Sequence, residues 1–269
     1  GPVMGWLADR LPRKWIMIAA DLVRFSPHFS GVIEFPSTGG VRDLLALRRR
    51  IAGERYDLIV DLHGSIRSRA VCAGARRVVR VRKRKTARFI LVRFHRDLYR
   101  WFGGAPSVAE RYLETVEPFG VKNDGKGLEL FIPAAAAGSA GAIATREGLP
   151  AGLPVIGVCP SARHQTKIWP AERFGEAAAT LAAEQGAAVL LFGSPGERAR
   201  CEDVARAIGA RSAEIRVVNL AGRVSLTETA ALMDRCFLVL TNDSGLMHIA
   251  AARKRKVVAV FGSTVRQFG

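Results

Sequence analysis

The sequence predicts an α/β fold built on a parallel sheet, and the pattern is clearest from residue 151 onward. Apolar runs rich in β-branched residues alternate there with stretches of helical periodicity, and the connections between them are short. Strand, helix, strand in repeated order is typical of a parallel sheet covered by helices on both faces. The expected strands are 155–159, 187–193, 217–220, 237–241 and 257–262, and the expected helices are 170–185, 196–208, 225–235 and 244–253.

The amino-terminal half is less regular but similar in kind, so we expect two Rossmann-like domains. They are placed at residues 1–133 and 153–269, with a linker at 134–152 that is rich in Ala, Gly and Pro. The length and the 49% apolar content suffice for two cores. In the first domain we expect strands at 15–20 and 31–35, a helix at 41–52, a buried strand at 58–62 and a helix from Ser65.

Both ends of the chain lack elements that a doubly wound domain normally has. Such a domain opens with a buried strand and a glycine-containing turn, whereas this chain begins with the pattern of a helix end. It stops at Phe268-Gly269, just past an expected strand. We therefore expect the fold to be truncated at both ends.

Cysteine usage and hydropathy indicate the compartment. The four cysteines are far apart, lack metal-type spacing and fall mostly in apolar runs, so we expect core thiols and neither zinc nor disulfides. No uncharged apolar run has the roughly 18 to 20 residues of a membrane span, and no signal peptide is visible. We expect a soluble cytoplasmic protein.

The net charge of +17 comes largely from the first half of the chain. Residues 76–100 contain eleven Lys and Arg against one acid, Asp97. Such a surface favours phosphate-rich partners: nucleic acid, anionic lipid or a phosphorylated glycan. The alternative is a solvated helix face. Nucleic acid is less favoured, because the segment lacks aromatics interleaved with glycine and no zinc finger or helix-turn-helix pattern accompanies it.

The most informative stretch is 241–262, TNDSGLMHIAAARKRKVVAVFG. A strand ends at Asn242 and a helix begins after a turn of small residues, which leaves the amides of Ser244, Gly245 and Leu246 facing outward. Together with the helix dipole they make an anion site that suits a phosphate. A further strand follows, so the site lies at the carboxyl edge of a parallel sheet, where open α/β folds bind their ligands. The sequence therefore predicts nucleotide binding.

Three more turns at this edge carry candidate ligands. Lys167, in the loop PSARHQTKIWP, can reach a diphosphate at that helix and neutralise charge on a leaving group; otherwise it is a surface lysine beside a packed Trp169. Glu197 begins a helix and either accepts ribose hydroxyls or complements the helix dipole. In AGRVS, Ser225 is expected to form a capping box with Glu228, and the preceding main chain can touch a base.

The remaining candidates are two carboxylates and several basic side chains. His248 is expected to hydrogen-bond the phosphate, although a lone histidine in a first turn is more often structural. Asp243 is unfavourable beside a phosphate unless it caps the helix or accepts sugar hydroxyls. In the first domain His63 and Arg67 can hold an anionic acceptor, and Asp61 is either part of that site or a structural carboxylate. No divalent metal is required.

Taken together, these segments resemble a known family. TNDSGLMHIAAA followed by VVAVFGST, the upstream KIWPAERF, the GSPGE turn and DLHGSIRSR are similar to the ADP-heptose:lipopolysaccharide heptosyltransferases, glycosyltransferase family 9. The likeness spans nearly the whole chain, and four separated motifs of the carboxyl half occur in the same order. It implies a GT-B fold, in which two Rossmann-like domains face each other across a cleft. The second holds the donor nucleotide sugar and the first the acceptor.

The resemblance also implies a function. Family members are inverting, metal-independent enzymes that transfer heptose from ADP-heptose to the inner core of lipopolysaccharide at the cytoplasmic membrane face; no cofactor is expected. Lipid A and the anionic inner membrane then become partners of segment 76–100, and nucleic acid is not expected. By resemblance, the diphosphate contacts are Lys167, Ser244, Gly245 and His248, the ribose contact is Glu197, the adenine contact is the main chain at Val224, and the sugar contact is Asp243.

One departure from the family affects catalysis. The general base there is an aspartate in a Gly-Asp turn after the first strand, a segment that this sequence lacks. Because an attacking hydroxyl must lose its proton, we expect these 269 residues to be part of a longer enzyme, able to bind donor but poor in transfer. Two alternatives stay open: a related GT-B enzyme acting on another sugar, such as an epimerase, and a non-catalytic module that binds a nucleotide sugar or anionic lipid.

Overall fold

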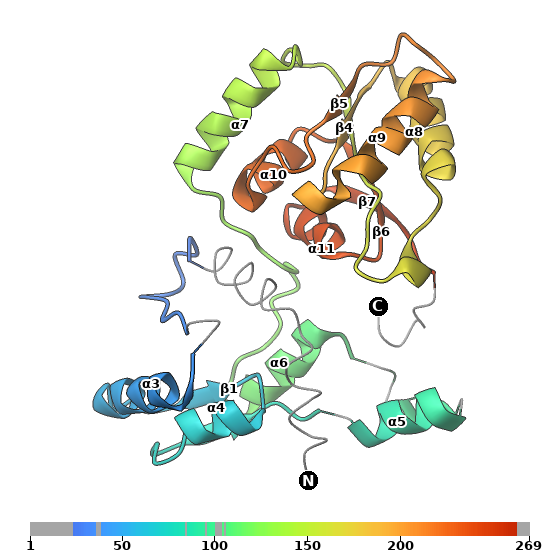
Figure 1. The fold of residues 1–269 in the computed structure, drawn as a ribbon. Helices are drawn as coiled ribbons and strands as arrows, with labels where there is room; N and C mark the ends of the chain where they lie inside the picture. Colours follow the sequence, from blue (N-terminus) through green and yellow to red (C-terminus); the bar gives the residue numbers. More distant parts are fainter. Residues whose placement is uncertain are drawn as a thin grey trace. The chain divides into compact units, whose positions relative to one another are not determined.

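The computed structural model describes residues 24–35, 39–83, 85–94, 96–99, 104 and 106–262. These residues form two compact units (Figure 1). Among the described residues, the carboxyl-terminal unit consists of 24–32 and 127–262, and the amino-terminal unit consists of those between 33 and 126.

A five-stranded parallel sheet forms the centre of the carboxyl-terminal unit, with strand order β5-β4-β3-β6-β7. The α/β class and the parallel sheet predicted from the sequence are confirmed. Every predicted strand and helix of this unit is present, with bounds that differ by at most two residues at either end. The strands are β3 (Val155–Cys159), β4 (Ala188–Leu191), β5 (Val217–Asn219), β6 (Leu238–Asn242) and β7 (Lys256–Val260), and the helices are α7 (Ala134–Arg146), α8 (Ala171–Gln185), α9 (Arg198–Gly209), α10 (Leu226–Met233) and α11 (Gly245–Ala252).

Helices cover both faces of this sheet (Figure 1). Alternate residues of a strand point to opposite faces, and β3 shows the alternation: Val155 and Cys159 belong to one hydrophobic cluster, Ile156 and Val158 to the other. The first cluster contains residues of α7, α10 and α11, and the second contains residues of α8 and α9. The central strands β3 and β4 are therefore covered on both sides, which is why their sequences are continuous apolar runs.

The segment predicted as a linker, 134–152, is not an unpacked connection. It contains α7, whose Ala140, Ile143 and Ala144 are buried in the core of the carboxyl-terminal unit. The Ser139 hydroxyl of α7 donates a hydrogen bond to the Glu228 carboxylate of α10 and, with the cap at Ser225, holds the pKa of that carboxyl below its usual range. Small residues let α7 lie close to α10, and this packing decides the structure of an Ala- and Gly-rich segment. The outer limits of the two predicted domains stay a prediction.

The amino-terminal unit holds a parallel pair of strands, with Ile59 opposite Val78. The predicted helix at 41–52, the strand at 58–62 and the helix after Ser65 are confirmed. Residues 31–35 form no strand, and the strand predicted at 15–20 lies outside the described residues. The second strand and two helices were not predicted. The elements are α3 (Val41–Gly53), β1 (Ile59–Asp61), α4 (Ile66–Val71), β2 (Val78–Arg80), α5 (Lys85–Phe94), α6 (Val108–Val116) and the 3-10 turn η2 (Glu117–Phe119).

The four cysteines are buried and free, as predicted for core thiols. Burial raises the pKa of Cys201 to about 12 and that of Cys236 to about 12. These thiols stay protonated at neutral pH and are poor nucleophiles. None of the helices in the described part of the chain is both long and apolar enough to cross a bilayer.

Candidate functional site

The site candidates lie where the order of the sheet reverses. From β3 the chain proceeds outward to β4 and β5, and from β6 to β7 on the other side, so the switch point lies between the neighbouring strands β3 and β6. Ligands of open α/β sheets bind in the crevice at this point, beyond the carboxyl ends of the strands. The loop after β3 carries Lys167, in the 3-10 turn η3 (Gln165–Lys167), and the turn after β6 carries Asp243.

The amino terminus of α11 presents main-chain donors at this edge. Ser244 is the N-cap in an extended conformation, and its side chain makes no cap hydrogen bond to the first turn. Its hydroxyl lies 3.4 Å from that of Thr241 instead. Ser244, Gly245 and Leu246 are all partly exposed. The first N–H groups of a helix have no partner within it, so this turn can donate to an anion. His248 is exposed on the next turn of the same helix.

Lys167 and Asp243 form an ion pair across the switch point. The distance between Lys167 Nζ and Asp243 Oδ2 is 2.5 Å, and the two side chains are 25% and 11% exposed. The pairing brings the predicted diphosphate ligand and the predicted sugar ligand together. The Lys167 ammonium also offsets the negative charge of Asp243, which would otherwise be unfavourable beside an anion site. The pair thus places a cation beside the residue that precedes the N-cap of α11.

Two further turns at the same edge contact each other. Glu197 ends the 3-10 turn η4 (Pro195–Glu197), and its carboxylate accepts a hydrogen bond from the Ser194 amide at 2.6 Å, so it serves as a cap. The Gly222 amide donates to the Gly193 carbonyl at 3.0 Å. A Cβ on Gly222, which has φ +73°, would lie 2.7 Å from the Pro195 Cα. This contact fixes the Glu197 turn against the AGRVS turn.

The AGRVS turn has the predicted local structure. Ser225 is the N-cap of α10 and forms a reciprocal capping box with Glu228. Val224, directly before it, is half-buried and packs against the core. The turns after β3, β4, β5 and β6 therefore place the predicted donor residues along one edge of the sheet.

The predicted acceptor residues lie in the amino-terminal unit. His63 and Arg67 are exposed on the turn after β1 and on the first turn of α4. Asp61 is 5% exposed, and its carboxylate accepts hydrogen bonds from the His63 amide at 3.1 Å, the Gly64 amide at 2.7 Å and the Ser68 hydroxyl at 3.0 Å. Of the two alternatives for Asp61, these contacts favour a structural carboxylate that shapes the turn.

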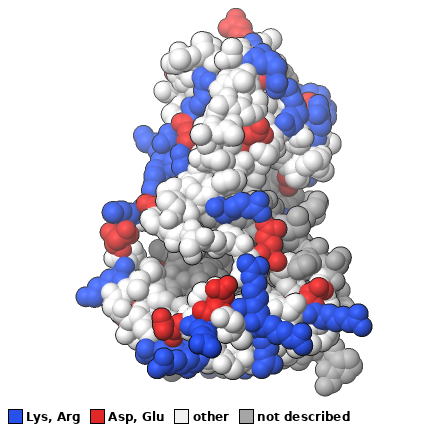
Figure 2. All heavy atoms as spheres, turned by 90° about the vertical axis from the view of Figure 1, so that its left-hand side faces the viewer, with Lys and Arg blue, Asp and Glu red and all other residues white. Residues whose placement is uncertain are grey.

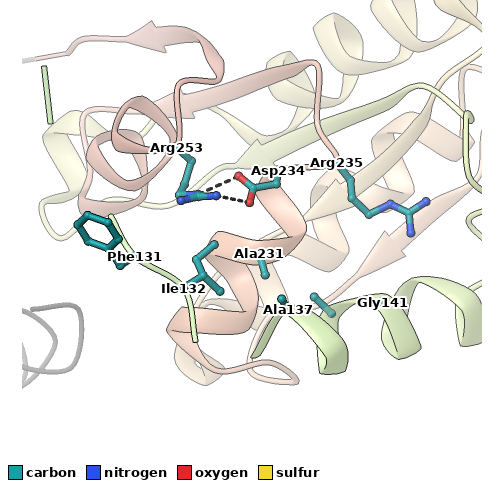
Figure 3. A pocket seen from close by; sticks show the side chains of 9 residues that line it. Phe131, Ile132, Ala137, Gly141, Ala231, Asp234, Arg235 and Arg253 are labelled. Atoms are coloured by element: carbon teal, nitrogen blue, oxygen red, sulfur yellow. Dashed lines mark hydrogen bonds and ion pairs between the residues drawn. The ribbon is translucent and has the colours of Figure 1, made fainter. Parts of the chain in front are cut away.

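A separate hollow of about 470 Å³ lies at the opposite edge of the sheet of the carboxyl-terminal unit, between α7 and the ends of α10 and α11 (Figure 3). Its polar groups contact protein atoms. Arg253 donates to the Asp234 carboxylate at 2.9 and 2.5 Å and to the Leu130 carbonyl at 2.6 Å, and Arg235 donates to the carbonyls of Leu149 and Pro150. The bonds to Leu130, Leu149 and Pro150 tie the chain before and after α7 to the rest of the unit, and we assign this hollow a structural role.

The chain was compared with known proteins. The model of glycosyltransferase family 9 (heptosyltransferase) matches residues 44–268. The chain belongs to this family. Lipooligosaccharide heptosyltransferase 2 of Haemophilus influenzae is 32% identical over 252 residues, covering 90% of this chain and 71% of the relative. As a member of glycosyltransferase family 9, the chain is a glycosyltransferase enzyme, and the resemblance drawn from its motifs is confirmed.

Solved structures of the family have the same fold. The family 9 glycosyltransferase of Veillonella parvula has a TM-score of 0.73 at 22% identity, over 92% of this chain and 71% of its own. The E. coli ADP-heptose lipopolysaccharide heptosyltransferase II has a TM-score of 0.61 at 24% identity, over 84% and 68%. The GT-B fold class of family 9 is thus confirmed for this chain.

The sequence predicted the Lys167 loop and the Asp243 turn, but it did not predict a role for two residues that hold them in place. Asn242 ends β6 and binds the main chain of Trp169, and Gly262 lies directly beneath the main chain of Thr166 and Lys167. The signal was present in the sequence as a polar residue ending a buried strand and a glycine ending the next one. Which loop each of them contacts depends on strand order.

Proposed function

We propose that the protein transfers heptose from ADP-heptose to the inner core of lipopolysaccharide, with inversion at the anomeric carbon and without a metal ion. The observation that carries the proposal is the Lys167–Asp243 ion pair in front of α11, at the switch point of the sheet. Membership of family 9 supports the reaction class. The names of the E. coli and H. influenzae relatives support the donor and the lipooligosaccharide type of acceptor.

The chemistry assigns a task to each turn. The amides of Ser244, Gly245 and Leu246, with His248, bind the diphosphate at the helix terminus. As the bond between the sugar and the diphosphate breaks, negative charge grows on the leaving ADP, and the Lys167 ammonium stabilises that charge. Asp243, held by Lys167, accepts hydroxyls of the sugar. The carboxylate of Glu197 accepts the ribose hydroxyls, and the main chain at Val224 contacts the adenine.

The acceptor hydroxyl attacks the anomeric carbon from the face opposite to the leaving ADP, and its proton passes to a general base. His63 and Arg67 are our candidates for holding the anionic acceptor. We assign no residue to the base.

Calorimetry with ADP-heptose tests the donor assignment. We expect heat of binding with ADP-heptose and with ADP, and a much weaker response with a uridine diphosphate sugar. Product analysis with a lipopolysaccharide core acceptor then separates transfer from epimerisation, because an epimerase changes the donor without an acceptor. Absence of heat with every adenine and uridine diphosphate sugar would contradict both the transferase and the silent nucleotide-sugar module.

We further propose that the protein binds the anionic cytoplasmic face of the inner membrane as a peripheral protein, through segment 76–100. In α5, Phe89 and Phe94 are 62% and 58% exposed, and their rings meet edge to face at 6.2 Å. Exposed aromatics within a basic segment suit the headgroup region, where each basic residue contributes about 1 kcal/mol. Basic side chains are not confined to α5, since Lys and Arg show more surface than Asp and Glu in Figure 2.

Sedimentation with lipid vesicles tests the membrane surface. We expect binding to vesicles that contain phosphatidylglycerol, loss of binding to pure phosphatidylcholine, and weakening as salt rises. Replacing Phe89 and Phe94 with serine should reduce the bound fraction while ADP affinity stays the same. Equal binding to both kinds of vesicle, or binding to RNA at the same salt concentration that prevents vesicle binding, would contradict the proposal.

A further inference from the structure

Asn242 connects the two loops of the donor site. It is the last residue of β6 and is fully buried. Its side-chain oxygen accepts a hydrogen bond from the Trp169 amide at 3.0 Å. The main-chain N–H of Trp169 can only donate, so the side-chain oxygen of Asn242, and not its nitrogen, must face it. Trp169 follows Lys167 by two residues, so Asn242 fastens the Lys167 loop to the strand that ends beside Asp243.

Asn242 is joined to its surroundings by one side-chain hydrogen bond. Its oxygen accepts from Trp169, and its Nδ2 has no hydrogen-bond partner among the described residues. An apolar residue of the same size would leave the Trp169 amide without this acceptor. The polar side chain at this position is therefore explained by its attachment to the Trp169 main chain.

Unsatisfied polar atoms concentrate at this crevice. Three buried side-chain nitrogen or oxygen atoms lack a partner within the described part of the chain, and two of them belong to Asn242 and to Ser161, two residues beyond β3. Folded proteins keep few such atoms, and each one requires an explanation. Both residues lie at the switch point, one at the end of β6 and the other in the loop after β3.

The rest of the loop is held on two other sides. The Trp169 ring packs edge to face on Phe174 of α8, with ring centres 5.1 Å apart. Gly262 contacts the loop as well: a Cβ on this residue would lie 2.4 Å from the Thr166 carbonyl oxygen and 3.1 Å from the Lys167 Cα. Only glycine permits this approach. Lys167 thus sits between a contact at Gly262 and the Asn242 bond.

We propose that Asn242 is a positioning residue of the donor site: its bond to the Trp169 main chain keeps Lys167 beside Asp243 and in front of α11. The inference deepens the proposed function and rests on it, because it concerns the lysine assigned to the diphosphate. Without the bond, the loop loses its attachment to β6, and Lys167 spends less time where a diphosphate binds.

A double-mutant cycle with ADP as the ligand tests the inference. Calorimetry is carried out on the wild type, Asn242→Leu, Lys167→Ala and the double variant. We expect Asn242→Leu to weaken ADP binding about three- to tenfold, the scale of one hydrogen bond. In the Lys167→Ala background the same substitution should change affinity less than about twofold, because it acts through the missing lysine. A purely structural residue would weaken binding equally in both backgrounds.

Two further variants separate an effect on the position of Lys167 from an effect on the stability of the protein. Ile208→Val removes a methylene from the core beneath α9, far along the chain from this loop, and should lower the melting temperature without changing ADP affinity. Gly262→Ala pushes the Lys167 loop from its other side, and serves as the second variant if Asn242→Leu does not fold. We expect Gly262→Ala to weaken ADP binding and also to be non-additive with Lys167→Ala.

The outcomes are distinct. If the folded wild type binds no ADP, the proposed function fails and this inference fails with it. If the wild type binds ADP and Asn242→Leu binds it equally well, only the positioning role is overturned. Additive effects of Asn242→Leu and Lys167→Ala would also overturn it, because Asn242 would then act independently of the lysine.

Discussion

Replacing Lys167 with alanine should weaken ADP binding by roughly 1.5 to 3 kcal/mol, or about 10- to 150-fold. The substitution removes a charge-assisted hydrogen bond to the diphosphate. It also leaves Asp243, which is 11% exposed, without the cation 2.5 Å away that offsets its charge. The diphosphate would then approach a carboxylate whose charge the Lys167 ammonium no longer offsets, so we expect the loss to fall in the upper part of the range. Calorimetry with ADP measures it directly.

A lysine at the other edge of the sheet provides the matched control. Lys256 begins β7, so it lies at the amino edge, and it is exposed. Lys256→Ala removes the same charge from the protein and should leave ADP affinity unchanged. Equal losses of ADP affinity in the two variants would mean that binding depends on the net charge of the protein and not on the position of Lys167. Unchanged affinity in Lys167→Ala would remove this lysine from the site.

Lys167 should also affect the rate of transfer, because of the stage at which negative charge develops on the leaving diphosphate. Charge develops on the diphosphate only as the sugar bond breaks, so the lysine stabilises the transition state more than the bound donor. In a protein that transfers heptose, Lys167→Ala should therefore lower kcat as well as donor affinity. A rise in KM with unchanged kcat would indicate that the lysine binds the ground state and the transition state equally.

The carboxyl-terminal unit was predictable because its central strands β3 and β4 are buried on both faces. Val155–Cys159 is fully apolar and coincides with β3, since a strand covered on both sides has no polar face to interrupt the run. The amino-terminal unit gave weaker signals. β2 has three residues, Val78–Arg80, and α5 lies in an arginine-rich run, so charge obscured the periodicity of both.

The location of the donor residues was predictable, but their contacts were not. The carboxyl ends of parallel strands share an edge, which places Lys167 and Asp243 on the same side of the sheet whatever the strand order. Their pairing joins residues 76 positions apart and requires β3 and β6 to be neighbours. No local pattern specifies that adjacency. The same holds for the bond from Trp169 to Asn242, which spans 73 positions.

Replacing Phe174 with alanine should lower the free energy of unfolding by about 3 to 5 kcal/mol, the usual cost of removing a large aromatic from a core. Phe174 is fully buried in the cluster between the sheet and helices α8 and α9. The cavity would open beneath Trp169, whose ring rests on Phe174, so the edge-to-face contact is lost as well. Urea unfolding followed by circular dichroism measures the change.

An exposed aromatic gives the comparison for Phe174. Phe89 is 62% exposed on α5, and Phe89→Ala should change the free energy of unfolding by less than about 0.5 kcal/mol. A loss below 1 kcal/mol in Phe174→Ala would contradict the packing described for α8. Because Trp169 anchors the Lys167 loop through this ring, ADP affinity should fall in the fraction of Phe174→Ala that remains folded. The two measurements together would show that the core packing beneath α8 also holds Lys167 in position.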